Sequence, residues 1–285
     1  MRFALRATIA AGLFFAPLTY ADAQAAGKTL AMDFRMTTSV QGMPDTGVIV
    51  GHAVGTSDKM RLDLSLKGAS ARLTPLGDSA VSMIVTDSGK TITYLDSKKS
   101  QFLRMKPAEM VAQAQQMGGM KMDFSETSAK VDSLGVGPAI LGHPTSHYRV
   151  TTGMTMTISA MGRQQTVKIA STNDGYYATD IKGYLNPFAT LTGGDMANLF
   201  GTTNKDFSDK MKAMQQKLPK GTPLRALTSA TVVAQGQTRV TSSAGEVTSV
   251  QWADADPKAF EVPSTYTPVQ LPGMGGSSSG AIPPE

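Results

Sequence analysis

The sequence predicts a β-dominated α+β protein: an open antiparallel β-barrel or a strongly curved sheet, with two or three helices on its concave side. Short runs of alternating apolar and polar residues begin at Lys28, and turn residues separate them at intervals of roughly 8–12 residues. Two segments with helical spacing interrupt these runs. The composition, 41% hydrophobic and 17% charged residues, is that of a chain with a folded core and excludes a disordered class.

The first block of strands is expected at residues 46–54, 60–66, 81–85, 91–95 and 101–105. In the second run every other residue from Met60 to Leu66 is apolar, and Arg61, Asp63 and Ser65 lie between them. Alternation of this kind turns one face of a strand toward a core and the other toward water. We therefore expect an antiparallel meander with one apolar face.

Two helices are expected, over residues 107–117 and 205–218. Pro107 suits the first helical position, and Gly118-Gly119 ends that run. The second helix begins after Asn204 and ends before Pro219. Its apolar stripe consists of Phe207, Met211, Met214 and Leu218. Residues 185–204, which contain Gly193-Gly194 and several apolar side chains, are interpreted as a partly helical lid.

The second block of strands is expected at residues 148–159, 164–171 and 176–181, with a hairpin turn at Asn173-Asp174-Gly175. Three final strands are expected at 224–234, 238–243 and 247–252, joined by Gly236 and by Ala244-Gly245. The two blocks, 28–105 and 148–182, are predicted to be halves of one curved sheet.

Both ends of the chain have a distinct composition. Residues 1–23 read as a cleaved signal peptide: Arg2 and Arg6 precede an apolar stretch, and Ala21-Asp22-Ala23 suits cleavage before Gln24. The expected location is therefore the periplasm, with no stable membrane insertion after cleavage. Residues 24–266 are expected to be one domain, and the Pro/Gly/Ser-rich residues 267–285 a disordered tail.

The charge and the cysteine content narrow the classes of function. The net charge is +5, and the basic residues are scattered, which argues against a nucleic-acid partner. The chain has no Cys, so in an oxidising compartment its core alone holds the fold.

Several short motifs occur in a fixed order along residues 28–266. They are Tyr94–Lys99, Gly142–Val150, Gly221–Arg225, Glu246–Val250 and Asp256–Tyr266. In this order the chain resembles an uncharacterised family of exported bacterial proteins, a domain of unknown function. That family is related in architecture to the periplasmic lipoprotein carriers and their outer-membrane receptors. The resemblance implies an incomplete antiparallel β-barrel whose concave face is covered by helices and, in the carriers, holds acyl chains.

Two sequence patterns that suggest chemistry are interpreted as structural. His143 and His147 have the i, i+4 spacing of a helical metal site, but Pro144 argues against a helix there. Gly276–Gly280 matches Gly-x-Ser-x-Gly, but it falls in the expected tail rather than on a strand-to-helix turn. We therefore expect no catalytic residues, no bound metal and no cofactor, and a protein that is not an enzyme.

Methionine is the one residue type in excess, with 18 residues. Thioethers adapt to apolar ligands of several shapes, and they also bind Cu(I). The leading hypothesis is a periplasmic binder or carrier of a hydrophobic ligand, an acyl chain or a lipidated peptide. The candidate ligand-binding residues are Phe188, Leu191, Leu199, Phe200, Phe207, Met211, Met214 and Leu218. The alternatives are an interaction module of the cell envelope with a protein partner and no small ligand, and copper binding by methionine.

Overall fold

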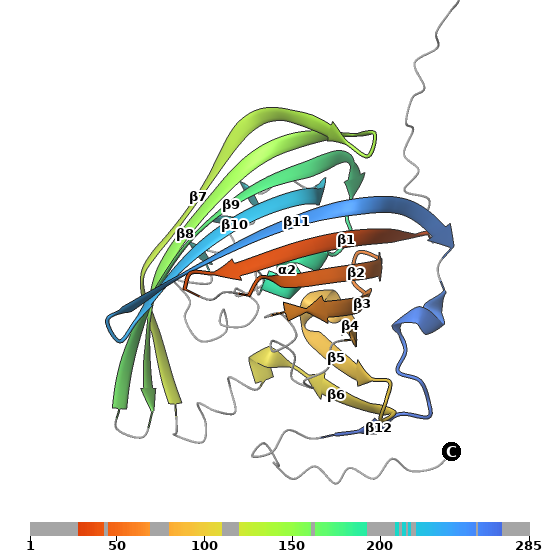
Figure 1. Cartoon of the computed structure of the whole chain (residues 1–285), viewed down its shortest axis with the longest axis horizontal. Coiled ribbons are helices and arrows are strands. Elements are labelled where there is room, and N and C mark those ends of the chain that lie inside the picture. The colour runs from red at the N-terminus through yellow and green to blue at the C-terminus, as the bar shows by residue number, and fades with distance from the viewer. Residues whose placement is uncertain are drawn as a thin grey trace, which may run out of the picture.

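Twelve strands form one sheet in the computed structural model of the chain (Figure 1). The structure describes residues 28–42, 45–68, 80–109, 120–160, 163–192, 209–210, 213–214, 216–217, 221–254 and 256–269. The strands are β1 (Lys28–Val40), β2 (Gly47–Gly55), β3 (Met60–Lys67), β4 (Ala80–Thr86), β5 (Thr91–Asp96), β6 (Gln101–Met105), β7 (Met120–Ile140), β8 (His143–Ala160), β9 (Arg163–Lys182), β10 (Gly221–Ala234), β11 (Gln237–Asp254) and β12 (Thr267–Pro268). In the described residues the fold is therefore nearly all β.

The strand order is β12-β6-β5-β4-β3-β2-β1-β11-β10-β9-β8-β7. Neighbours are antiparallel except for β12, which runs parallel to β6. Pairing of β1 with β11 joins the N-terminal strands to the C-terminal ones, so the expectation that the two blocks belong to one sheet is confirmed. Figure 1 shows the long strands β7–β11 curving away from the shorter strands β2–β6.

The apolar face of β1–β4 forms the main core. The predicted alternation in β3 is confirmed, since Met60, Leu62, Leu64 and Leu66 are all buried. The same face carries further buried residues on the neighbouring strands: Leu30, Met32, Phe34, Met36, Ile49, Ala53, Val81, Met83 and Val85. Each large side chain buried in this way contributes about 1.5–3 kcal/mol. The opposite face is mixed: it carries Asp33, His52, Asp63 and Ser82, but also the exposed Val50 and the buried Ile84.

Helix α2 (Pro187–Thr192) packs against this core. The side chain of Asn186 accepts a hydrogen bond from the backbone N–H of Phe188 at 2.9 Å and caps the helix. Of the two predicted helices, residues 107–109 and residues 209–210, 213–214 and 216–217 are helical, and the remainder lies outside the described residues. The structure does not show the expected two or three helices on the concave side, because so few described residues are helical. No helix in this part of the chain has the length and hydropathy of a membrane span.

Two predicted turns are wrong, because Asn173-Asp174-Gly175 lies inside β9 and Ala244-Gly245 lies inside β11. The glycines serve packing instead. A Cβ at Gly245 would meet the ring of Phe188 at 2.8 Å, and one at Gly175 would overlap the ring of Tyr177. Each glycine leaves room for an aromatic ring on a continuous strand. In the sequence alone, such a glycine cannot be told from a glycine in a turn.

Strand β7 was not expected from the sequence. It is 21 residues long, mostly exposed, and pairs only with β8 among the described strands. Three register shifts interrupt that pairing, between Ser125 and Ser128, Ser133 and Gly135, and Gly137 and Ile140. These irregularities remove the alternation from which strands are recognised.

Residues 256–269 return to the sheet. A short 3-10 helix, η3 (Pro257–Phe260), follows Asp256, whose carboxylate accepts the N–H of Lys258, and this helix contacts β3 and β4. The expected tail starts at Thr267, and the structure places Thr267 and Pro268 in β12. Residues 270–285 and the expected signal peptide lie outside the described residues.

Candidate functional site

Phe188 connects α2 to the apolar face of the sheet. Its ring meets that of Phe34 edge to face, with centroids 5.6 Å apart. The ring of Phe34 lies over Gly51, its partner on β2, and the ring of Phe188 lies over Gly245 on β11. Both contacts exist because two glycines leave the sheet surface open beneath the rings.

The structure brings together part of the predicted ligand surface. Phe188 is buried in the core, and Leu191, one helical turn later, packs against the same cluster. Met214 is half-buried within a helical segment, while its neighbour Ala213 is exposed. The other candidates lie outside the described residues: Leu199, Phe200, Phe207, Met211 and Leu218.

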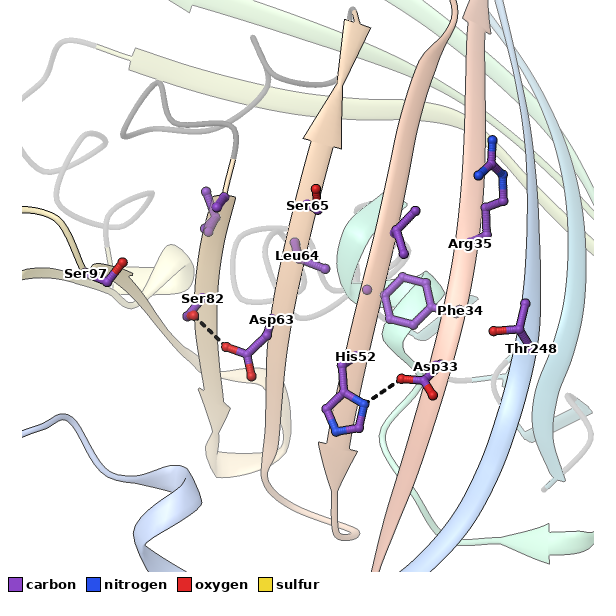
Figure 2. A pocket seen from close by; sticks show the side chains of 14 residues that line it. Asp33, Phe34, Arg35, His52, Asp63, Leu64, Ser65, Ser82, Ser97 and Thr248 are labelled. Atoms are coloured by element: carbon purple, nitrogen blue, oxygen red, sulfur yellow. Dashed lines mark hydrogen bonds and ion pairs between the residues drawn. The ribbon is translucent and has the colours of Figure 1, made fainter.

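A groove of about 610 Å³ lies on the opposite face of the same strands, lined by both polar and apolar residues (Figure 2). Asp33, His52, Asp63 and Ser82 occupy one register row across β1–β4. Nδ1 of His52 lies 2.7 Å from a carboxylate oxygen of Asp33, and the hydroxyl of Ser82 donates to Asp63 at 2.5 Å. The row therefore consists, in order, of a carboxylate, an imidazole, a second carboxylate and a hydroxyl.

Arg61 binds Asp63 from the same strand, two residues away. Its Nε and one terminal nitrogen donate to the carboxylate at 3.0–3.2 Å. Burial acts to raise the pKa of Asp63, but the hydrogen bonds from Arg61 and Ser82, together with the charges of Arg61 and His52, outweigh it. The pKa of Asp63 therefore lies below its ordinary value, and this carboxylate is anionic at neutral pH.

In this row the carboxylate of Asp33 orients the imidazole of His52. An imidazole held in this way can act as a general base when a hydroxyl lies within hydrogen-bond reach of its other nitrogen. No described hydroxyl is hydrogen-bonded to Nε2 of His52, since that of Ser82 is committed to Asp63. The described residues therefore supply no complete nucleophile and base set in this groove.

His143 and His147 both lie on β8 and bind different carboxylates. Nδ1 of His143 is 2.8 Å from Asp180, and Nε2 of His147 is 3.6 Å from Asp174. The ring of His147 stacks on Tyr176 with centroids 4.3 Å apart. Within the described ranges no group of three or more His, Asp and Glu side chains is placed to hold a metal ion.

A second groove, of about 470 Å³, crosses β1, β11, β10 and β9. Small hydroxyl side chains dominate its lining, and four of them occupy one register row: Ser39, Ser242, Ser229 and Thr172. Polar side chains thus line part of each groove, and neither groove belongs to the apolar face on which Phe188 and Leu191 pack.

The polar row was not identified from the sequence. The alternation in residues 60–66 places Arg61, Asp63 and Ser65 on one face of β3, but no local pattern relates Asp63 to His52 or Asp33. The relation depends on the register between strands, which sets residues 11 to 19 positions apart opposite one another. Only a prediction of strand pairing could have found it.

No family model and no curated protein matches the chain. Among solved structures, PNGF-II, determined in the C2 space group, is similar over 85% of this chain, with 12% identity and a TM-score of 0.30. The matched region is 31% of that protein, so this chain spans less than a third of its length.

Proposed function

We propose that the chain is a periplasmic, non-catalytic binder or carrier of a hydrophobic ligand, an acyl chain or a lipidated peptide. The observation that carries the proposal is the apolar face of β1–β4, on which Met32, Met36, Met60 and Met83 are all buried. Unbranched thioether side chains repack around ligands of different shape at low cost, whereas a core of branched residues does not. A methionine-rich face on a curved sheet suits a ligand of variable chain length.

Helix α2 is suited to act as the replaceable cover of that face. A helix of six residues is not stable in isolation, so it forms only when docked. It docks through apolar side chains, with Phe188 against Phe34 and Leu191 against the core cluster. An acyl chain that takes the place of the Phe188 side chain would leave every strand pair intact. We propose that the helices expected at 107–117 and 205–218 complete the cover on the concave side, with Phe207, Met211, Met214 and Leu218 facing the ligand.

Binding of a fluorescent fatty-acid analogue tests the proposal. Met214→Asp places a carboxylate at a half-buried position, and Ala213→Asp adds the same charge at the exposed neighbouring position. We expect the unaltered chain and Ala213→Asp to bind the probe equally and Met214→Asp to bind at least about tenfold more weakly, since about 1.4 kcal/mol suffices for that factor. Circular dichroism and the melting temperature establish that both variants are folded. Absence of probe binding by the unaltered chain, or equal binding by all three proteins, contradicts the proposal.

One observation favours a second candidate, an envelope module that binds a protein partner. The outer edge of β7 pairs with no other strand in the described part of the chain, and free edges accept added strands. A photo-crosslinking residue in place of Lys130, on β7, would then give a protein adduct in cells. The same residue in place of Ser65, on interior strand β3, provides the control. Adducts at neither position, or equal adducts at both, contradict this second candidate.

A further inference from the structure

The hairpin that joins β7 to β8 has an exposed apolar end, which we call the hairpin tip (residues 133–142). Its sequence, SLGVGPAILG, contains no charged side chain. Every residue of the tip except Gly137 and Ile140 is exposed, with Val136 at 92%, Leu141 at 47% and Leu134 at 44%. Three of the five large apolar side chains that are exposed in the described residues therefore lie within this one short segment.

The turn at the end of the hairpin has an unfavourable residue for its backbone conformation. Leu141 and Gly142 form a two-residue loop and have positive φ angles of 53° and 82°. Two-residue loops of this kind favour Asn, Asp or Gly at the first position, because a bulky side chain strains a left-handed backbone. An exposed leucine at that position therefore stabilises neither the turn nor the core. The side chain is therefore available for a contact outside the folded chain.

We propose that the hairpin tip inserts reversibly into the interfacial region of a lipid bilayer. A specific protein interface involves about 20–30 residues on each side, and three apolar side chains on a narrow hairpin are far fewer. A bilayer accepts a few apolar side chains without a matched surface. The size of the exposed apolar area thus favours a lipid surface over a second copy of the chain.

The charges and the strand irregularities around the tip also favour a lipid bilayer as its partner. The charged side chains that flank the tip are paired: Lys130 with Asp132 at 3.0 Å, and His143 with Asp180 at 2.8 Å. The tip therefore has no basic patch that would require anionic lipid. Within the tip, the register shifts at Ser133/Gly135 and Gly137/Ile140 also disrupt the edge of β7, which hinders addition of a second copy as a strand at that place.

Flotation of the full chain with vesicles tests the proposal, using phosphatidylcholine alone and phosphatidylcholine with phosphatidylglycerol. The test variant is Val136→Ser/Leu141→Asn. The matched control is Val50→Ser/Leu227→Asn, which removes the two exposed large apolar side chains that the described residues carry outside the tip, on β2 and β10. We expect the test variant to lose at least about tenfold in partitioning into both vesicles, and the control to change by less than about twofold. The loss should be equally large at low and high salt.

The melting temperature distinguishes a role of Leu141 in membrane contact from a role in stabilising the fold. Because Asn suits the left-handed backbone, Leu141→Asn alone should raise the melting temperature while lowering vesicle binding. A lower melting temperature together with weaker binding, equal losses in test and control variants, or no vesicle binding by the unaltered chain would overturn the proposal. A lipid-free dimer that the test variant abolishes would assign the tip to a second copy instead. The proposal does not depend on fatty-acid binding, and the test variant should bind the fluorescent fatty acid normally.

Discussion

The rings of Phe34 and Phe188 meet edge to face, at 5.6 Å between centroids and 79° between planes, and this contact fastens α2 to the sheet. Phe34 belongs to β1 at the centre of the twelve-stranded order, and Phe188 lies more than 150 residues later. The contact therefore links the apolar face to the segment that we propose covers it.

Removing this contact should destabilise the chain. Phe188→Ala deletes a buried aromatic ring and should lower the free energy of unfolding by about 3–5 kcal/mol. Urea denaturation measures the change. A loss below about 1 kcal/mol would show that the ring is not part of the core.

Gly245→Ala tests the packing beneath the ring. The added Cβ would lie 2.8 Å from the Phe188 ring, so overpacking should cost about 1–3 kcal/mol. In a Phe188→Ala background the same change should be nearly neutral, because the ring is absent. Equal costs in both backgrounds would assign the effect to the strand rather than to the ring.

Much of the fold follows from local patterns, as β3 illustrates. Its alternation of Met60, Leu62 and Leu64 with polar residues predicts both the strand and its buried face. At Gly175 and Gly245 the sequence predicts turns where the structure has continuous strands. A glycine that accommodates an aromatic ring has the same sequence signature as a glycine in a turn. The row of Asp33, His52 and Asp63 depends on interstrand register, which no window of neighbouring residues contains.

Stability should depend on pH through Asp63. Its pKa is lower in the folded chain than in the unfolded one, so its contribution to stability is present above the unfolded value near 3.8. The contribution is lost as the pH falls through the lower, folded value. Asp63→Asn should therefore be less stable than the unaltered chain at pH 7, and the difference should shrink toward pH 2.

Ser82→Ala provides the graded comparison for that prediction. It removes one of the hydrogen bonds that lower the pKa of Asp63 and leaves those from Arg61 in place. We expect a smaller loss in the same pH range, measured by denaturation from pH 2 to 7. A difference between Asp63→Asn and the unaltered chain that is constant with pH would contradict this explanation.

The boundary of the dispensable C-terminus should lie after Val269. Backbone N–H groups of Thr267 and Val269 donate to Ser100 and Phe102 at 2.9 and 2.8 Å. A chain that ends at 269 should keep its melting temperature, whereas one that ends at 266 should lose several degrees, since each such bond is worth about 0.5–1.5 kcal/mol. Equal melting temperatures of the two truncated chains would show that β12 adds nothing.

Export can be tested at the other terminus. We predict cleavage before Gln24, on the basis of the basic first residues and of Ala21-Asp22-Ala23. N-terminal sequencing of the protein from a cell fraction enriched in periplasm should begin at Gln24. A sequence that begins at Met1 would contradict export by this route.

Native mass spectrometry of the protein purified from a cell fraction enriched in periplasm tests the central claim, that the apolar face accepts a hydrophobic ligand, most directly. We predict a population heavier than the bare chain by the mass of an acyl-chain compound, which lipid extraction then identifies. Met214→Asp should lack this population, and Ala213→Asp should retain it. A spectrum that shows only the bare chain, from protein that is folded and was never exposed to detergent, would contradict the claim.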